Sequence, residues 1–258
     1  MSHELCLVKN GAVAEICLDR PAKHNAMTPA MAERLEQVCA DINRDDAVRC
    51  VIIHGAGDKA FCAGSDIGAL DEYPDVFAFR NRVDYSTALR SVRKPVIAAL
   101  KGWVLGGGLE LALSADIRIA SATARLGAPE VGLGWVGAGG ASQLLPRLVG
   151  YGKALYLLLD GEPIDAEQAY AWGLIEKLVP AGDELTAART LAAKWSTHSA
   201  VALETVKAAV RHSMSAGLEP GIRYENEVMS LAFALGNDAK GRAGFHNQTV
   251  RADQKKEP

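Results

Sequence analysis

Residues 101–113 read KGWVLGGGLELAL, an apolar stretch that runs into three consecutive glycines, Gly106 to Gly108, and then into an apolar segment containing Glu110. Each glycine in a helix interior would cost about 1 kcal/mol, so three in a row predict a turn where the backbone comes close to another group. The residues that follow fit a helix, whose first N–H groups can bind negative charge. The stretch therefore predicts a ligand-binding turn with a carboxylate one turn inside the helix.

The composition is that of an ordinary globular protein. The 258 residues are 49% hydrophobic and 23% charged, which suffices for one domain, alone or with a helical appendage. A formal net charge of −3 disfavours nucleic acid as a partner. The start, MSHELCLVKNG, lacks a basic segment followed by an apolar one, and no apolar run could span a bilayer, so we expect a cytoplasmic location and no membrane partner. The five cysteines include no CxxC pair, which predicts reduced thiols and no metal site.

Strand-like and helix-like patterns alternate along the first part of the chain, and helical patterns dominate afterwards. The expected strands are residues 13–18, 50–54, 95–100 and 116–121, and the expected helices begin at Thr28–Pro29 and cover 143–159, 165–172 and much of the chain beyond Asp183. This order predicts an α/β architecture with a helical C-terminal part.

Two backbone N–H groups are candidates for an anion-binding pair. In residues 60–66, AFCAGSD, the small Ala63 and Gly64 leave the backbone uncovered, so that the N–H of Ser65 could face a ligand. The N–H of Gly107 could face the same point. Two converging donors of this kind form an oxyanion hole, in which each donor lowers the barrier by about 3 kcal/mol.

A second carboxylate follows in residues 125–140, where Glu130 stands after Pro129 among small and apolar residues. A desolvated carboxylate, or one beside a like charge, can exchange a proton near neutral pH. Simpler interpretations stay open: Glu110 could be a solvated helix-start residue, Glu130 a solvated loop carboxylate, and residues 137–140 a tight turn.

Other side chains have a structural and a functional interpretation. Ser65 could be a nucleophile, but no G-x-S-x-G elbow surrounds it, so covalent catalysis is disfavoured. Cys62 fits a packed thiol, and Asp66 fits a helix cap better than an acid at the site. Trp135 fits packing or the lining of an acyl pocket.

These motifs, taken in order, resemble the crotonase, or enoyl-CoA hydratase/isomerase, superfamily over most of the chain. The resemblance rests on Arg20-Pro21 with Asn25-Ala26-Met27, on residues 60–67 (AFCAGSDI), 94–99 (KPVIAA), 106–112 (GGGLELA), 129–134 (PEVGLG) and 137–140 (GAGG), and on residues 169–175 (AYAWGLI). One such motif would be weak, whereas this many in order is specific.

The resemblance implies an α/β fold of the crotonase-like (ClpP/crotonase) class, a spiral of ββα repeats. Residues 1–195 would form the spiral core, and residues 196–258 a helical region for oligomerisation and for covering the active site. Members are usually trimers or paired trimers, so a homotrimer or a dimer of trimers is expected. The substrate would be an acyl-CoA thioester, with no separate cofactor, because coenzyme A is part of the substrate.

The same resemblance implies roles for individual residues. The thioester oxygen would sit between the N–H groups of Ser65 and Gly107. Glu110 would activate a water that attacks the β carbon, and Glu130 would exchange the proton at the α carbon. By the same resemblance, a further set of residues would contact the nucleotide and pantetheine of coenzyme A: Lys23, Asn25, Ala26, Met27, Ala63, Asp66 and Ile67. Trp135 would line the acyl pocket.

The predicted function is that of an enoyl-CoA hydratase, which adds water reversibly to a 2-enoyl-CoA thioester. The runner-up is double-bond isomerisation, which in this superfamily can run with one carboxylate at the Glu130 position; a dehydratase of another acyl-CoA is also open. Keeping Glu110 favours hydration. The alternative from a different class is an inactive or RNA-binding member of the superfamily. Residues 30–46 mix acidic with basic side chains, which disfavours RNA binding.

Overall fold

The chain divides into two compact units, Met1–Ser196 and Thr197–Pro258. Of these, the computed structural model describes residues 4–71 and 73–196 in the first unit and residues 197–235 in the second. The described part contains no helix that is long and apolar enough to cross a membrane.

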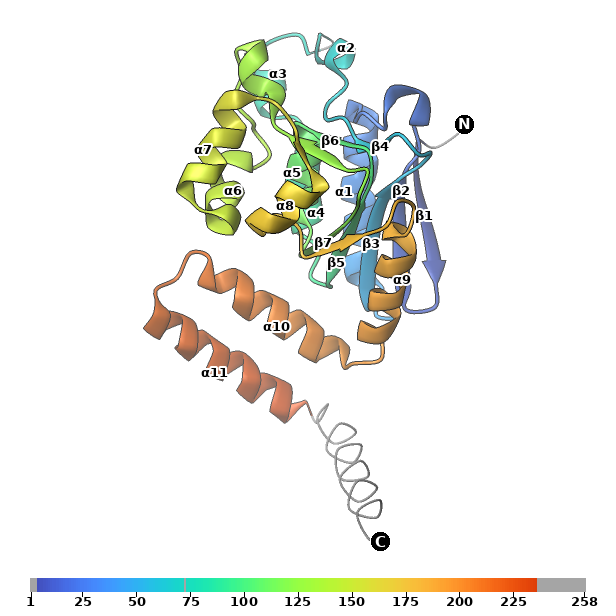
Figure 1. Cartoon of the computed structure of the whole chain (residues 1–258). Helices are drawn as coiled ribbons and strands as arrows, with labels where there is room; N and C mark the ends of the chain where they lie inside the picture. Colours follow the sequence, from blue (N-terminus) through green and yellow to red (C-terminus); the bar gives the residue numbers. More distant parts are fainter. Residues whose placement is uncertain (1–3, 72, 236–258) are drawn as a thin grey trace, which may run out of the picture. The chain divides into compact units, whose positions relative to one another are not determined.

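The first unit contains a six-stranded and a four-stranded sheet (Figure 1). The larger sheet has the order β1-β2-β3-β5-β7-β10, and all its neighbours are parallel except the β1-β2 hairpin. The smaller sheet has the order β4-β6-β8-β9 and is parallel except for β8-β9. The strands are β1 (Leu5–Asn10), β2 (Val13–Leu18), β3 (Cys50–Gly55), β4 (Ala60–Cys62), β5 (Val96–Leu100), β6 (Trp103–Leu105), β7 (Ile117–Ser121), β8 (Arg125–Gly127), β9 (Ile164–Asp165) and β10 (Lys177–Val179).

From β3 to β8, successive strands alternate between the two sheets. β3 lies in the larger sheet and β4 in the smaller, and the pairs β5-β6 and β7-β8 repeat this division. Helical segments follow each pair: α2 (Ile67–Leu70), α3 (Val76–Arg80) and α4 (Tyr85–Arg90) after the first, α5 (Gly107–Ser114) after the second, and η2 (Pro129–Leu133), α6 (Ala141–Val149) and α7 (Tyr151–Asp160) after the third. Each turn of the chain is thus a ββα repeat, and the predicted α/β spiral is confirmed.

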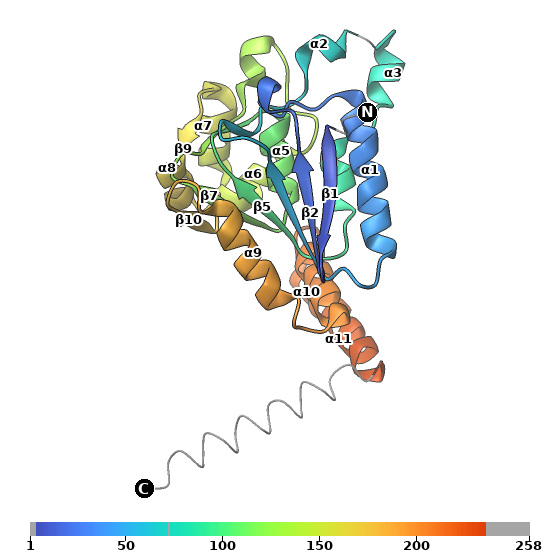
Figure 2. The same cartoon turned by 90° about the vertical axis from the view of Figure 1, so that its right-hand side faces the viewer.

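The larger sheet is buried on both faces. α1 (Pro29–Arg44) covers one face and α9 (Glu184–Trp195) the other (Figure 2). Because neighbouring residues of a strand point to opposite faces, Ile53 belongs to the cluster with α1 and Ile52 to the cluster with α9. α1 begins as predicted: the Thr28 side chain accepts a hydrogen bond from Met31 N at 3.2 Å.

The prediction that helix dominates over residues 143–159 is confirmed, although the helix is not continuous. The chain forms α6 and α7, separated by Gly150, whose φ of 85° and ψ of 160° no helix can contain. The predicted helix 165–172 is α8 (Ala166–Trp172), capped by the Asp165 side chain, which accepts from Gln168 N at 2.8 Å. A short 3-10 helix, η1 (Pro21–Lys23), precedes α1.

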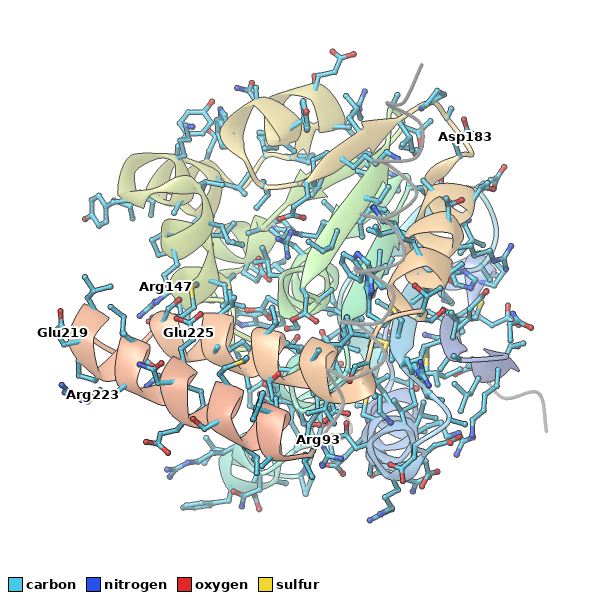
Figure 3. The ribbon with its side chains drawn as sticks, turned by 90° about the horizontal axis from the view of Figure 1, so that it is seen from below. Arg93, Arg147, Asp183, Glu219, Arg223 and Glu225 are labelled. Atoms are coloured by element: carbon cyan, nitrogen blue, oxygen red, sulfur yellow. The ribbon has the colours of Figure 1, made fainter. Side chains whose placement is uncertain are left out.

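Over residues 197–235 the second unit forms a pair of helices, α10 (Ala200–Ser213) and α11 (Leu218–Ala234). The two helices pack side by side, and the ring of His212 lies 4.5 Å from that of Tyr224, centroid to centroid. Glu219 and Arg223 lie one turn apart at the start of α11 (Figure 3). The roles predicted for this region, oligomerisation and covering of the active site, stay predictions.

We expect Lys94 to stabilise the first unit by capping α1. Its side chain is 2% exposed, and Nζ donates to the carbonyls of Ile42 at 2.5 Å and Asp45 at 2.6 Å. Lys94→Met leaves these carbonyls without that donor, which should lower the free energy of unfolding by about 1–3 kcal/mol in urea titrations. The exposed Lys177 offers a matched control, since Lys177→Met should change stability by less than about 0.5 kcal/mol. Equal stability of the two variants would contradict the capping role.

Candidate active site

The candidate site lies where three neighbouring strands of the smaller sheet end. β4, β6 and β8 are parallel, so their carboxyl ends meet at one edge of the sheet. Ser65, Gly107 and Glu130 each follow one of these strands within a few residues. Ligands of open parallel sheets bind at such an edge. The spiral therefore brings together residues that are far apart in the sequence.

The backbones of Ser65 and Gly107 lie next to each other. A Cβ on Gly64, whose φ is +98°, would be 3.1 Å from the nitrogen of Gly107. Met27 pairs with this segment by donating to Gly64 O and accepting from Asp66 N, both at 2.8 Å, and this pairing does not use the N–H of Ser65. Gly107 is the first residue of α5, so its N–H has no acceptor within the helix.

A tyrosine hydroxyl covers this pair of backbone groups. A Cβ on Gly107 would lie 1.8 Å from Tyr85 Oη, so only glycine fits at this position. Tyr85 Oη is 3.0 Å from Ser65 Oγ, within hydrogen-bond distance. Burial raises the pKa of Tyr85, so the phenol stays protonated at neutral pH.

Glu110 is buried at the end of the first turn of α5, and a glycine-rich loop surrounds its carboxylate. The residue is 5% exposed, and Oε1 accepts a hydrogen bond from Ala141 N at 3.1 Å. A Cβ on Gly137 would lie 2.6 Å from Oε1, and one on Gly139 would lie 2.7 Å from Oε2. Residues 137–140 therefore enclose the carboxylate of Glu110 as well as making a turn.

Glu130 lies in η2, and its carboxylate reaches the turn before α5. A Cβ on Gly106 would be 3.0 Å from Glu130 Oε1. Among the described residues, the buried Oε2 of Glu130 and Oγ of Ser86 have no hydrogen-bond partner. Buried polar atoms in native proteins almost always have one. Arg34 Nε and Glu184 Oε2 also lack a partner among the described residues, so the two atoms at the site show that hydrogen-bonding capacity is left there for a substrate or water, and do not by themselves mark a ligand.

The two carboxyl groups share a raised tendency to hold a proton. Burial raises the pKa of Glu110, and the negative charge of Asp84 raises it further. Hydrogen bonds from the N–H groups of Ala141, Gly139 and Gly140 lower it and offset part of this rise. Burial also raises the pKa of Glu130; its own backbone N–H opposes this, and the charge of Glu110 adds to it. Such groups can exchange protons near neutral pH. Nowhere in the described chain do three His, Cys, Asp or Glu side chains gather as metal ligands.

The residues predicted to contact coenzyme A fall into two groups. The first is internal: Met27 is 2% exposed, Ala26 is 9% exposed, and the buried Asn25 amide accepts from Arg20 N and donates to two backbone carbonyls. These side chains shape the loop from within. The second group, Lys23, Ala63, Asp66 and Ile67, is at least partly exposed. The coenzyme A contacts stay a prediction for the whole set.

Two further predictions concern Asp66 and Trp135. The Asp66 side chain caps α2 by accepting from Gly68 N at 3.2 Å, which confirms the helix-cap interpretation, and it also pairs with Arg20 at 2.9 Å. Trp135 lies beside Glu130, because its backbone N donates to Glu130 O at 2.9 Å. Its side chain is half-exposed, and its acyl-pocket role stays a prediction.

Sequence reasoning missed the contribution of α4. Tyr85, Ser86 and Arg90 all reach the site from this helix, which lies in a segment without a recognisable motif. Asp84 offers the one local signal, since its side chain accepts from Ser86 N at 2.9 Å as a helix cap. That signal marks a helix start and says nothing about the site.

Comparison with known proteins gives relatives over nearly the whole chain. The short-chain-enoyl-CoA hydratase of Clostridium acetobutylicum is 34% identical over 246 residues, covering 94% of each protein. The crotonyl-CoA hydratase of Syntrophomonas wolfei is 34% identical over 251 residues, covering 95% of this chain and 96% of that protein. The crystal structure of enoyl-CoA hydratase from Bacillus anthracis is 30% identical with a TM-score of 0.90, covering 95% of this chain and 97% of that one.

A family model agrees with these relatives and with the geometry of the site. Residues 8–251 match the model of the enoyl-CoA hydratase/isomerase family. This match spans both candidate carboxylates, both candidate N–H donors and all ten strands except the start of β1. The chain belongs to the enoyl-CoA hydratase/isomerase family.

Proposed function

We propose that this protein is an enoyl-CoA hydratase, a hydro-lyase that adds water to the α,β double bond of a 2-enoyl-CoA thioester. The observation that carries the proposal is the meeting of two poorly solvated carboxylates, Glu110 and Glu130, with two adjoining backbone N–H groups at one sheet edge. The relatives named for hydration of short-chain enoyl-CoA and crotonyl-CoA support the same reaction.

In the proposed reaction the thioester oxygen accepts hydrogen bonds from the N–H groups of Ser65 and Gly107. Attack at the β carbon moves negative charge onto this oxygen, so donors fixed there before the reaction stabilise the enolate. Support comes from the closeness of the two backbone segments, since a Cβ on Gly64 would lie 3.1 Å from the nitrogen of Gly107.

The two carboxyl groups carry the protons. Glu110 accepts one proton of the water whose oxygen bonds to the β carbon, and Glu130 delivers a proton to the α carbon, so that the elements of water are added across the double bond. Return of a proton from Glu110 to Glu130, directly or through solvent, restores both groups. Burial raises the pKa of both carboxyl groups, and at Glu110 the N–H groups of residues 139–141 counteract this rise, which favours the charged form that a base requires. The raised pKa of Glu130 favours its protonated form, as an acid requires.

No cofactor beyond the coenzyme A of the substrate is proposed. Hydration involves no net oxidation or reduction, and the two carboxyl groups account for both proton transfers. We also place the protein in the cytoplasm, where acyl-CoA thioesters are available to it and where its cysteines would stay reduced; the described cysteines are all free thiols.

Replacement of either carboxyl group tests the hydration reaction. Glu110→Gln and Glu130→Gln keep the size of each side chain and remove its ability to exchange a proton. We expect each to lower kcat for crotonyl-CoA by at least about 100-fold, since general acid–base catalysis contributes that much. Loss of the ultraviolet absorbance of the conjugated thioester measures turnover.

Three outcomes of this experiment would contradict the hydratase assignment. Wild type without turnover over a range of enoyl-CoA chain lengths would exclude it, as would both variants at full rate. Loss confined to Glu130→Gln, together with conversion of a 3-enoyl-CoA to its 2-enoyl isomer, would identify an isomerase instead.

The oxyanion hole is tested at Ser65, where main chain and side chain can be separated. Ser65→Pro removes the N–H and should lower kcat by about 100- to 1000-fold. Ser65→Ala removes only the hydroxyl and keeps the N–H, so it should stay close to wild type in stopped-flow or steady-state assays with crotonyl-CoA. Equal kcat values for the two variants, at matched thermal stability, would rule out this N–H as a donor.

We propose that the protein assembles as a homotrimer or a dimer of trimers. Helices α10 and α11 carry large apolar side chains at the surface, with Val206, Leu218 and Met229 each at least 60% exposed. Patches of this kind mark protein interfaces. Light scattering should give three or six times the 27.3 kDa of one chain, and Met229→Glu should lower that mass. A monomer at all concentrations would disprove the assembly.

A further inference from the structure

Arg90, the last residue of α4, contacts two segments of the candidate site at once, one through a backbone carbonyl and one through a side-chain hydroxyl. Its Nη1 donates to the carbonyl of Gly139 at 2.6 Å and to Ser114 Oγ at 3.1 Å. Gly139 belongs to the loop that encloses the Glu110 carboxylate, and Ser114 ends the helix that carries Glu110. One guanidinium nitrogen therefore ties the loop to the helix.

Both contacts continue to Glu110. The Ser114 hydroxyl donates to the backbone carbonyl of Glu110 at 2.7 Å, one helical turn earlier. On the other side, a Cβ on Gly139 would lie 2.7 Å from Glu110 Oε2, and the N–H groups of Gly139 and Ala141 face the same carboxylate. The main chain of Glu110 and the loop that receives its side chain thus share one anchor.

The anchor is itself held in place. Arg90 Nη2 donates to Thr87 Oγ1 at 2.6 Å and lies 3.8 Å from Asp84 Oδ2. The Thr87 hydroxyl in turn donates to Asp84 Oδ2 at 2.5 Å. Asp84 caps α4, so its carboxylate is fixed to the start of the helix whose end carries Arg90. A planar guanidinium with several donors can satisfy all these acceptors together, which an ammonium group cannot.

We propose that Arg90 is a positioning residue of the hydration reaction, which holds the loop of residues 137–141 against Glu110 so that the carboxylate is placed to activate water. The inference rests on the base role given to Glu110 in the proposed function. Arg90 does not touch the substrate; it acts through Gly139 and Ser114. Nothing in the sequence motifs points to it, because it lies outside all of them.

Loss of this anchor has a signature in the pH dependence. Burial raises the pKa of Glu110, and the loop N–H groups oppose that rise. The other groups that face Glu110 are the Asp84 carboxylate, the neutral phenol of Tyr85 and the carboxyl of Glu130. With the loop released, the pKa of Glu110 rises further. Because a base must be ionised, the acidic limb of the rate profile then moves to higher pH.

The experiment compares Arg90→Gln and Arg90→Lys with wild type in the full-length protein. For Arg90→Gln we expect a fall in kcat of about 10- to 100-fold with little change in KM, as for a misplaced catalytic group, and an acidic limb at higher pH. Arg90→Lys keeps the positive charge and restores part of the contact, so it should lie between the two. Arg93→Gln is the matched control, since exposed Arg93 donates to the Asn43 carbonyl away from the site.

Unchanged kcat and pH profile in Arg90→Gln would overturn the proposal, and so would a rise in KM alone. If Arg90→Gln does not fold, Arg90→Lys decides: wild-type kcat and an unmoved acidic limb would then refute it. Titration of isotope-labelled Glu110 by NMR separates this inference from the proposed function. If the pKa of Glu110 is raised in Arg90→Gln but the wild-type protein turns over no enoyl-CoA, the anchoring role of Arg90 is supported and the hydratase function is refuted. If the pKa of Glu110 is the same in Arg90→Gln and wild type, the anchoring role is refuted.

Discussion

A carboxylate as buried as that of Glu110 can stay charged only where the main chain supplies hydrogen bonds to it. This requirement governs the surroundings of the site. Two of the three glycines in residues 137–140 are required by the carboxylate, which comes within 2.6–2.7 Å of where side chains would begin at Gly137 and Gly139. The third, Gly140, has a φ of +118°. The same requirement accounts for the start of α6 at Ala141, because the backbone N–H of Ala141 donates to Oε1 of Glu110.

A second requirement is that donors from different turns of the spiral meet. Alternation of the strands between two sheets satisfies it, because β4, β6 and β8 become neighbours and their ends lie together. Ser65, Gly107 and Glu130 then need only short connections to reach one point. Tyr85 completes the arrangement from α4 by covering Gly107 and contacting Ser65. The larger sheet supplies the rigid support, since α1 and α9 bury both its faces.

Much of this was predictable from the sequence, and the remainder has physical reasons. The longer buried strands and the capped helix α1 follow from apolar runs and from Thr28-Pro29, and the glycines of residues 106–108 mark the start of α5. Strands of two or three residues, such as β4, β6 and β9, carry no usable periodicity. Gly150 breaks a continuous helical pattern through its backbone conformation alone. Tyr85, Ser86 and Arg90 reach the site only through tertiary packing, which no local pattern encodes.

The strand alternation also determines when the site can exist. Neighbours in the larger sheet, such as β3 at residues 50–55 and β5 at 96–100, are distant along the chain, and contacts of this kind form slowly because long loops must close first. The candidate N–H donors and carboxylates belong to successive ββα repeats of the spiral. No single repeat therefore contains enough of them to form the site. Catalytic competence is therefore a property of the closed spiral as a whole, and a break in any of these turns leaves well-formed secondary structure without a site.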